Sequence, residues 1–292
     1  MKKKRRWTPI SALALIILLT VSIATGCGQQ SGGQDAKPLI KIGYINWQED
    51  VAVTYLWQEI LQEKGYQVEL LSVDAAPLFV GLNKGDLDLF LDSWLPITQQ
   101  AYWEKYKDKL DDYGSWYTGE AKIGLAVPTY VNLDSITQLN DQKANFGGQI
   151  IGIDPGAGIM KSADKAQKDY ALNYDIVQGS EAAMLAALDK AYKEKKPIVI
   201  TAWSPHWMFS KYDLKYLTDP KKDFGSSEGL HVLANKDFTL KQPAVAAMLK
   251  KFKLNDQQIG TLEDLINQGL SPQDAAKKWI STNQTVVNSW LK

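Results

Sequence analysis

The 292-residue sequence predicts an α/β protein of two lobes with a ligand cleft between them. Apolar strand-like runs alternate with helix-spaced apolar runs, which is the pattern of βαβ units and a mostly parallel sheet. This alternation begins near residue 38 and starts again near residue 121, without any repeated sequence. The chain is also long enough for two packed lobes.

The first set of elements begins with the strand "LIKIGYINW". A helix follows in "EDVAVTYLWQEILQEKG", where Gly65 ends the helical spacing. The next elements are a strand in "YQVELLSV", a short helix in "APLFVGLNKGD" with Pro77 near its first turn, and a strand in "LDLFLDSW". Ligands bind at the carboxyl ends of strands in such sheets. Trp47 and Trp94 lie at two of these ends.

The second set begins with the strand "AKIGLAVP" and continues with "GQIIGIDPGAGIMKSADKAQKDY", read as a strand, a glycine-rich turn and a helix. "EAAMLAALDKAYKEKK" predicts an amphipathic helix, and "PIVITAW" predicts a strand that ends at Trp203. The chain from about Asp237 onward is mostly helical in pattern. We therefore expect one lobe from residues 38–123 plus 228–292 and a second lobe from residues 124–227.

The N-terminus predicts an export signal over residues 1–26. Five basic residues precede the apolar run "ISALALIILLTVSIATGC", which ends in small residues and is short for a transmembrane helix, the alternative interpretation. "ATGC" resembles the lipobox of bacterial lipoproteins, which implies a lipidated Cys27. Residues 27–37, rich in Gly, Gln and Ser, predict a flexible linker. We expect a soluble body anchored by lipid at the extracytoplasmic face of the cell membrane.

Composition argues against several classes of function. Without residues 1–26 the chain has 28 basic and 33 acidic residues, a net charge of −5, which does not favour binding to nucleic acid. The sequence has two histidines, one cysteine, and no HExxH, CxxC or GxSxG motif. "DPGAGIMKS" resembles a phosphate loop only in part, because Met160 stands where glycine is required. We predict a protein that is not an enzyme and uses neither a metal nor a cofactor.

The positions of three tryptophans predict a binding site. A tryptophan at one strand end is usually a core residue, because the indole is large and apolar. Trp47, Trp94 and Trp203, however, all lie at strand ends, where they can converge as an aromatic cage. A quaternary ammonium has no N–H group to donate, and ring faces attract its diffuse charge. The cage therefore predicts a ligand with such a cation.

The glycine-rich turn "DPGAG" predicts an anion site. Gly156 and Gly158 allow the backbone to approach a ligand closely, and the N-terminus of the following helix offers free N–H groups. The amides of Gly158 and Ile159 are candidates for holding a carboxylate. A strand-to-helix turn with no ligand is the alternative, since such turns are common.

The chain resembles the glycine betaine-binding proteins of osmoregulatory ABC importers. The resemblance covers nearly all of the chain from about Leu39 and is carried, in order, by "GYINWQED", "LDSWLPITQQAYWEKY", "AKIGLAVP", "IIGIDPGAGIMK", "SEAAMLAAL" and "TAWSPHWMFSKYDLKYL". It implies a type II periplasmic-binding-protein fold that closes on glycine betaine or proline betaine. It also implies cage roles for Trp47, Trp94 and Trp203, carboxylate binding by the amides of Gly158 and Ile159, and a membrane permease as partner of a monomer.

The sequence departs from this family at one position. Relatives commonly carry histidine five residues after the second cage tryptophan, whereas this chain has Gln99. Glutamine donates through its amide nitrogen but stays neutral, so Gln99 is an alternative donor to the ligand carboxylate. The same fold tuned to choline, carnitine or a sulfonium osmolyte is the nearest alternative function. An exported choline-ester hydrolase and a purely structural surface protein are the distant ones, and no nucleophile and base are recognisable for the hydrolase.

Overall fold

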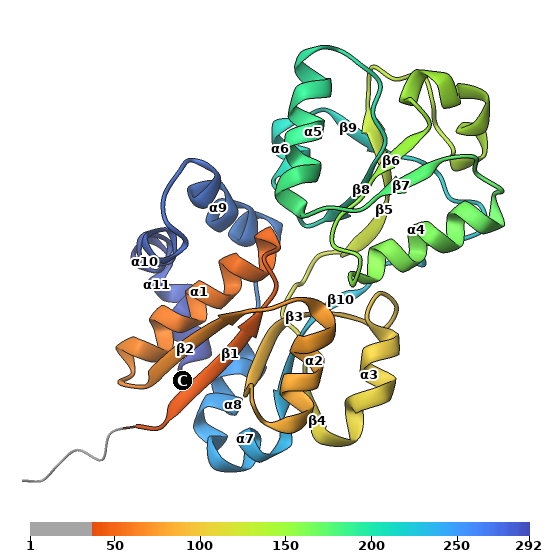
Figure 1. Ribbon diagram of the computed structural model, residues 1–292. Helices are drawn as coiled ribbons and strands as arrows, with labels where there is room; N and C mark the ends of the chain where they lie inside the picture. Colours follow the sequence, from red (N-terminus) through yellow and green to blue (C-terminus); the bar gives the residue numbers. More distant parts are fainter. Residues whose placement is uncertain (1–36) are drawn as a thin grey trace, which may run out of the picture. The chain divides into compact units, whose positions relative to one another are not determined.

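The computed structural model describes residues 37–292 (Figure 1). The predicted signal peptide of residues 1–26, Cys27 and nearly all of the linker lie outside the described residues. From residue 37 to the C-terminus, the chain has no helix with the length and apolar character needed to cross a bilayer.

The first lobe is built on a five-stranded sheet with the order β2-β1-β3-β10-β4. Its strands are β1 (Leu39–Tyr44), β2 (Gln67–Ser72), β3 (Leu89–Leu95), β4 (Leu110–Ser115) and β10 (Gly229–Asn235). β1 pairs in parallel with β2 and β3, whereas β10 is antiparallel to both β3 and β4. Four strands thus run in one direction. The fifth, β10, comes from the far end of the chain.

The second lobe repeats this plan with the order β7-β6-β8-β5-β9. Its strands are β5 (Lys122–Pro128), β6 (Gln149–Ile151), β7 (Asp175–Val177), β8 (Ile200–Ser204) and β9 (Leu214–Tyr216). β6 pairs in parallel with β7 and β8, and β5 is antiparallel to β8 and β9. The predicted two-lobed α/β architecture is confirmed, and each sheet carries one antiparallel strand.

Both antiparallel strands follow a crossing of the chain between the lobes. β5 is the first strand after the chain leaves the first sheet, and β10 is the first after it returns. The two crossing segments pair at one antiparallel bridge, where the amide of Glu228 donates to the carbonyl of Ala121 at 2.7 Å. This short two-stranded connection is the hinge of the molecule. Lys122 and Ile123, assigned by sequence to the first lobe, pair with β8 in the second sheet.

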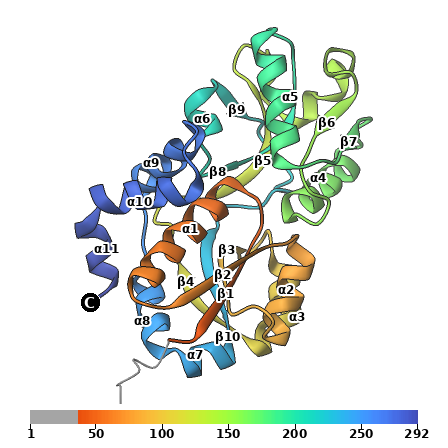
Figure 2. The ribbon, with the colours of Figure 1, turned by 60° about the vertical axis from the view of Figure 1, so that its left-hand side comes forward.

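Helices cover the faces of both sheets (Figure 2). They are α1 (Gln48–Glu63), α2 (Ala75–Lys84), α3 (Gln100–Tyr106), α4 (Gly158–Asp169), α5 (Glu181–Lys193), α6 (Met208–Lys211), α7 (Lys236–Lys241), α8 (Pro243–Lys251), α9 (Asp256–Asn267), α10 (Pro272–Thr282) and α11 (Gln284–Trp290), with 3-10 turns at Lys107–Lys109, Ile136–Gln138 and Asn140–Phe146. Side-chain caps begin several of them. Ser180 accepts the Ala183 amide at α5, and Ser271 precedes Pro272 at α10.

The C-terminal helices return to the first lobe, where α9 and α10 pack against α1. Trp57 on α1 is fully buried there. Its ring stacks on Trp290 of α11 at 6.1 Å between centroids and meets Phe252 edge-on at 5.4 Å. Trp57 and Trp290 are therefore core residues, and they fix the C-terminal helices against α1.

Four strands and two helices were not predicted from the sequence. They are β4, β7, β9, β10, α3 and α6. β7 and β9 have only three residues each, and β4 is the polar, glycine-containing run "LDDYGS". Such short or polar segments become strands only because a neighbouring strand accepts their hydrogen bonds. β10, "GLHVLAN", was not predicted as a strand, yet its pairing with β3 and β4 makes it a central strand.

Candidate functional site

The three strand-end tryptophans meet at one small cavity between the lobes. Trp47 is the N-cap residue of α1, Trp94 lies near the end of β3, and Trp203 lies near the end of β8. All three are buried, with exposed fractions of 5%, 3% and 3%. The cavity is lined by Trp47, Glu49, Trp94, Thr98, Ile123, Ile153, Ala157, Gly158, Ile159 and Trp203. Five of the six predicted ligand-contacting residues, all except Gln99, therefore lie around one space.

The cavity is narrow. Its volume is about 20 Å³, which is room for about one water molecule. Its walls come from both lobes, since Trp47, Trp94 and Thr98 belong to the first and Ile153, Gly158 and Trp203 to the second. A ligand of several heavy atoms can therefore enter only if the lobes move apart.

Each of the three indole N–H groups donates to a carboxylate. Trp47 Nε1 donates to Asp154 Oδ2 at 3.2 Å, and Trp203 Nε1 donates to Glu49 Oε2 at 2.9 Å. Both bonds join the two lobes. These two carboxyl groups orient the rings of Trp47 and Trp203.

The third indole is held within its own strand. Trp94 Nε1 donates to Asp92 Oδ2 at 3.2 Å. Side chains two residues apart on a strand point to the same face of the sheet. Asp92 and Trp94 therefore share the face that meets the cavity.

Burial raises the pKa of the acidic side chains beside the cage. The pKa of Asp92 rises to about 7 because the carboxyl group is fully buried, although the N–H group of Trp94 opposes the shift. Burial likewise raises the pKa of Glu49, and the neighbouring charges of Asp92 and Glu181 raise it further. The pKa of Glu263 on α9 rises to about 8, again mainly through burial. A cation in the cage would favour the charged forms of Glu49 and Asp92 and so lower their pKa values.

The glycine turn forms the other wall of the cavity. α4 begins at Gly158, and no side chain caps this N-terminus. Within the described chain the amides of Gly158 and Ile159 have no hydrogen-bond acceptor. A Cβ atom on Gly158 would lie 2.1 Å from the carbonyl oxygen of Thr98, so only glycine fits while the lobes are in contact. Two N–H groups at the positive end of a helix are thus available to an anion.

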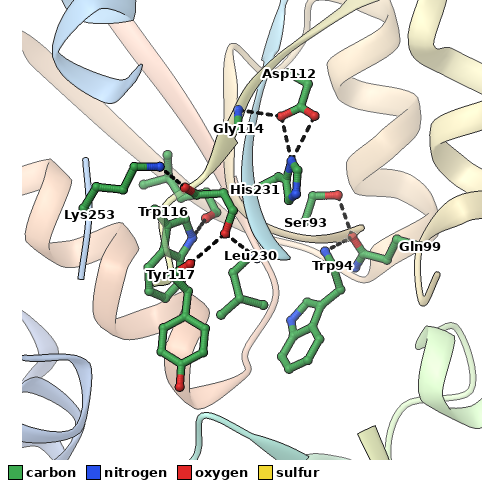
Figure 3. A network of polar contacts seen from close by, with 12 residues as sticks. Ser93, Trp94, Gln99, Asp112, Gly114, Trp116, Tyr117, Leu230, His231 and Lys253 are labelled. Atoms are coloured by element: carbon green, nitrogen blue, oxygen red, sulfur yellow. Dashed lines mark hydrogen bonds and ion pairs between the residues drawn. The ribbon is translucent and has the colours of Figure 1, made fainter. Parts of the chain in front are cut away.

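Gln99 is fully buried and does not line the cavity. Figure 3 shows it beside Ser93 and Trp94. Its Oε1 accepts from the Trp94 amide at 3.2 Å and from Ser93 Oγ at 3.0 Å. Its Nε2 is buried and has no partner within residues 37–292. The side chain therefore supports Trp94 through its oxygen, while its donor nitrogen stays unused.

Neither histidine lines the cavity. His206 Nδ1 accepts the Met208 amide at 2.9 Å, so the ring carries its proton on Nε2, which contacts Glu181 Oε1 at 3.0 Å. His231 contacts Asp112 on β4 (Figure 3) and is not among the residues that line the cavity. No cluster of three or more metal-ligating side chains occurs in the described part of the chain.

A larger cavity of about 780 Å³ lies between α9 and the β8–α6 segment. Trp207 lines it, as do His206 and Glu263, but none of the six predicted ligand-contacting residues does. Trp207 is half-buried and packs against His206 with 5.4 Å between ring centroids. Trp207 therefore lies outside the small cavity.

Several residues of the site were not predicted from the sequence: Glu49, Asp92, Thr98, Asp154, Ile123, Ile153 and Ala157. For two of them the sequence carries a recognisable pattern. Asp92 precedes Trp94 by two residues in a strand, and Glu49 follows Trp47 by two residues at the start of a helix. Asp154 belongs to the site because it accepts a hydrogen bond from Trp47.

Two α/β lobes joined by a two-strand hinge, with an aromatic cavity between them, define a substrate-binding protein of an ABC importer. Residues 38–282 match the model of the family described as the substrate binding domain of an ABC-type glycine betaine transport system, and the chain belongs to that family. The resemblance seen in the sequence is thereby confirmed. Members of this class are transport proteins that act outside the cytoplasm with a membrane permease.

Individual relatives agree with this assignment. A glycine betaine/carnitine transport binding protein of Listeria monocytogenes is 41% identical over 51% of this chain and 52% of its own length, so the match spans about half of that relative. A glycine betaine/proline betaine-binding periplasmic protein of Salmonella typhimurium is 26% identical over 98% of both chains.

Solved structures show the same fold. Lactococcal OpuAC, closed and complexed with glycine betaine, has a TM-score of 0.83 and 36% identity over 88% of this chain and 100% of its own. The glycine/betaine/L-proline-binding protein ProX of Borrelia burgdorferi has a TM-score of 0.84 and 32% identity over 87% of this chain and 97% of its own.

Proposed function

We propose that this protein captures glycine betaine or a closely related quaternary-ammonium osmolyte outside the cytoplasm and delivers it to a permease. The observation that carries the proposal is the convergence of three buried indoles from both lobes beside two free helix N-terminal amides. A cage for a cation and a site for an anion, one beside the other, fit a zwitterion.

The cation of the ligand would lie among Trp47, Trp94 and Trp203. Each good contact between a cation and an indole face contributes about 0.5 to 2 kcal/mol. The carboxylates that accept the three indole N–H groups add negative charge behind the rings. A quaternary ammonium, which cannot donate a hydrogen bond, gains most from this diffuse attraction.

The carboxylate of the ligand would accept from the amides of Gly158 and Ile159, at the positive end of α4. Gln99 Nε2 is buried without a partner among residues 37–292. It would be a third donor to the ligand carboxylate once the lobes have opened to admit the ligand. A neutral amide replaces the imidazole of relatives at this position, so the carboxylate is held by neutral donors alone.

Capture requires opening and closing about the hinge at residues 121 and 228. We propose that the two bodies that move are those expected from the sequence, residues 38–123 plus 228–292 and residues 124–227, except that Lys122 and Ile123 move with the second body because they pair with β8. A lipid at Cys27 and the linker of residues 27–37 would keep a monomeric receptor at the membrane near its permease.

Carnitine and choline are the second candidates. The Listeria relative is named for glycine betaine and carnitine. The buried acidic side chains Glu49 and Asp92 lie beside the cage and attract a cation whether or not the ligand carries its own carboxylate. A ligand with a more distant carboxylate, or none, is thus compatible with the cage.

A tryptophan-fluorescence titration of residues 28–292 tests the proposal. We expect a saturable change at much lower concentrations of glycine betaine or proline betaine than of choline, and Trp94→Ala should abolish it. A response to choline alone would keep the cage and remove the anion site. Silence with betaines, carnitine, choline and the sulfonium analogue would refute the proposed function.

A further inference from the structure

Three consecutive residues at the start of α1 each form a hydrogen bond to the opposite lobe. Trp47 donates to Asp154 in the β6–α4 loop, the Gln48 amide donates to Glu181 on α5, and Glu49 accepts from Trp203 on β8. Three separate elements of the second lobe are thus held by one turn of backbone in the first.

The Gln48 bond is a helix cap supplied by the other lobe. α1 has no side-chain cap of its own, and the Gln48 amide is the first N–H of the helix. Glu181 Oε2 accepts it at 3.0 Å. A carboxylate at a helix N-terminus satisfies a free N–H group and interacts favourably with the helix dipole.

Glu181 is itself fixed in place. Its exposed fraction is 5%, and its Oε1 accepts from His206 Nε2 at 3.0 Å. Because His206 Nδ1 is occupied by the Met208 amide, the Nε2 proton requires an acceptor. One carboxylate therefore serves a histidine in its own lobe and a helix N-terminus in the other.

The charges that face these bonds are mostly acidic. Glu49, Asp92 and Glu263 lie close enough to Glu181 to influence one another's ionisation, and His206 contacts it directly. α1 is rigid behind this cluster, because α9 and α10 pack along it. Movement of the second lobe away from α1 must break all three bonds together.

We propose that residues 47–49 form a closure latch, in which Asp154 and Glu181 are positioning residues that slow release of the ligand. This inference rests on the proposed function, because the latch acts on whatever ligand the cage holds. The bonds exist only while the lobes are in contact. Their loss therefore raises the dissociation rate and leaves the association rate of the open form unchanged.

The first test removes one acceptor at a time from the chain of residues 28–292. Asp154→Ala removes the partner of Trp47, and Asp154→Asn keeps an oxygen that can accept. Glu181→Gln has one oxygen for two donors, so either His206 or Gln48 loses its partner. Asp164→Ala, at an exposed position on α4 with no side-chain bond found in residues 37–292, is the matched control.

Stopped-flow fluorescence with glycine betaine measures both rate constants. We expect the dissociation rate to rise about fivefold in Asp154→Ala and in Glu181→Gln. This is the size of effect expected when one hydrogen bond comparable to a helix cap is lost. Asp154→Asn should recover most of the wild-type rate, and Asp164→Ala should not change it. Dissociation rates within twofold of wild type in both Asp154→Ala and Glu181→Gln would overturn the latch.

A second measurement needs no ligand. Spin labels on cysteines placed at the exposed positions Glu63 and Lys190 report the distance between the lobes. We expect Asp154→Ala and Glu181→Gln to shift the distribution towards longer distances, with unchanged circular dichroism as the check on folding. If the wild-type protein binds no osmolyte, the proposed function is wrong. The latch is tested separately: distance distributions of Asp154→Ala and Glu181→Gln that match that of wild type would refute it.

Discussion

Asp92 and Trp94 lie two residues apart on β3, and the carboxylate of the first accepts the indole N–H of the second at 3.2 Å. The second oxygen of Asp92 is buried without a partner among residues 37–292. The carboxyl group beside Trp94 is therefore costly to ionise. As a result, both the stability of the fold and the affinity for a cation should depend on pH.

The stability of the folded protein should fall as pH rises from about 4 to about 7. The pKa of Asp92 is about 7 in the folded protein and about 3.9 when unfolded. Between these values the folded state binds more protons than the unfolded state, so a rise in pH favours unfolding. The slope from one such group reaches about 1.4 kcal/mol per pH unit.

Asp92→Asn isolates this contribution, because the amide oxygen can still accept from Trp94. Urea unfolding of both proteins at several pH values should give a flatter pH dependence for the variant between pH 4 and 7. Parallel curves would mean that Asp92 ionises normally in the folded state.

Ligand affinity should rise with pH below about 7. A quaternary ammonium beside Glu49 and Asp92 favours their ionised forms, so binding lowers their raised pKa values and releases protons. Affinity can gain up to about tenfold per pH unit for each proton released. Calorimetry in two buffers with different ionisation enthalpies counts the protons, and proton uptake or a flat profile would contradict the expectation.

Gln99→Glu should separate the two halves of the ligand. Glutamate keeps the oxygen that accepts from Ser93 and Trp94, but it replaces the unpartnered donor nitrogen with a charged oxygen. We expect glycine betaine affinity to fall at least about tenfold, as for loss of one hydrogen bond to a charged group. Choline, which has no carboxylate, should bind no worse. Equal losses for both ligands in a titration would show that Gln99 acts only through Trp94.

Gly158→Ala should block closure without harming the fold. The added Cβ would meet the Thr98 carbonyl at 2.1 Å, a contact that disappears when the lobes separate. Alanine is otherwise acceptable in the first turn of a helix and reduces the entropy of the unfolded chain. We expect affinity to fall at least about a hundredfold, or about 2.7 kcal/mol, with an unchanged or slightly higher melting temperature.

Gly156→Ala is the matched control for this experiment, because a Cβ there would meet nothing within 4 Å. It should bind like wild type. Comparable losses in both variants, measured by calorimetry, would locate the defect in the loop itself and not in the contact between lobes.

Much of the site could be predicted from local pattern. Trp94 and Trp203 lie near the ends of apolar strands, Trp47 follows β1 by three residues, and Gly158 opens a helix after a glycine-rich turn. Strand ends and helix starts are local features, and the rule that ligands gather at the carboxyl ends of strands brings them together. The two-lobed fold was predicted from two successive sets of strands and helices, because the alternation of strands and helices is also a local pattern.

Tertiary structure alone decided which groups meet across the cleft. Glu49 and Trp203 are 154 residues apart, and Gln48 and Glu181 are 133 apart, so no local periodicity relates them. β10 became a central strand because β3 and β4 were free to accept its hydrogen bonds. The sequence determined the cage and the turn, which depend on neighbours along the chain. The carboxylate partners and the contacts that join the lobes depend on how two separately folded bodies close on each other.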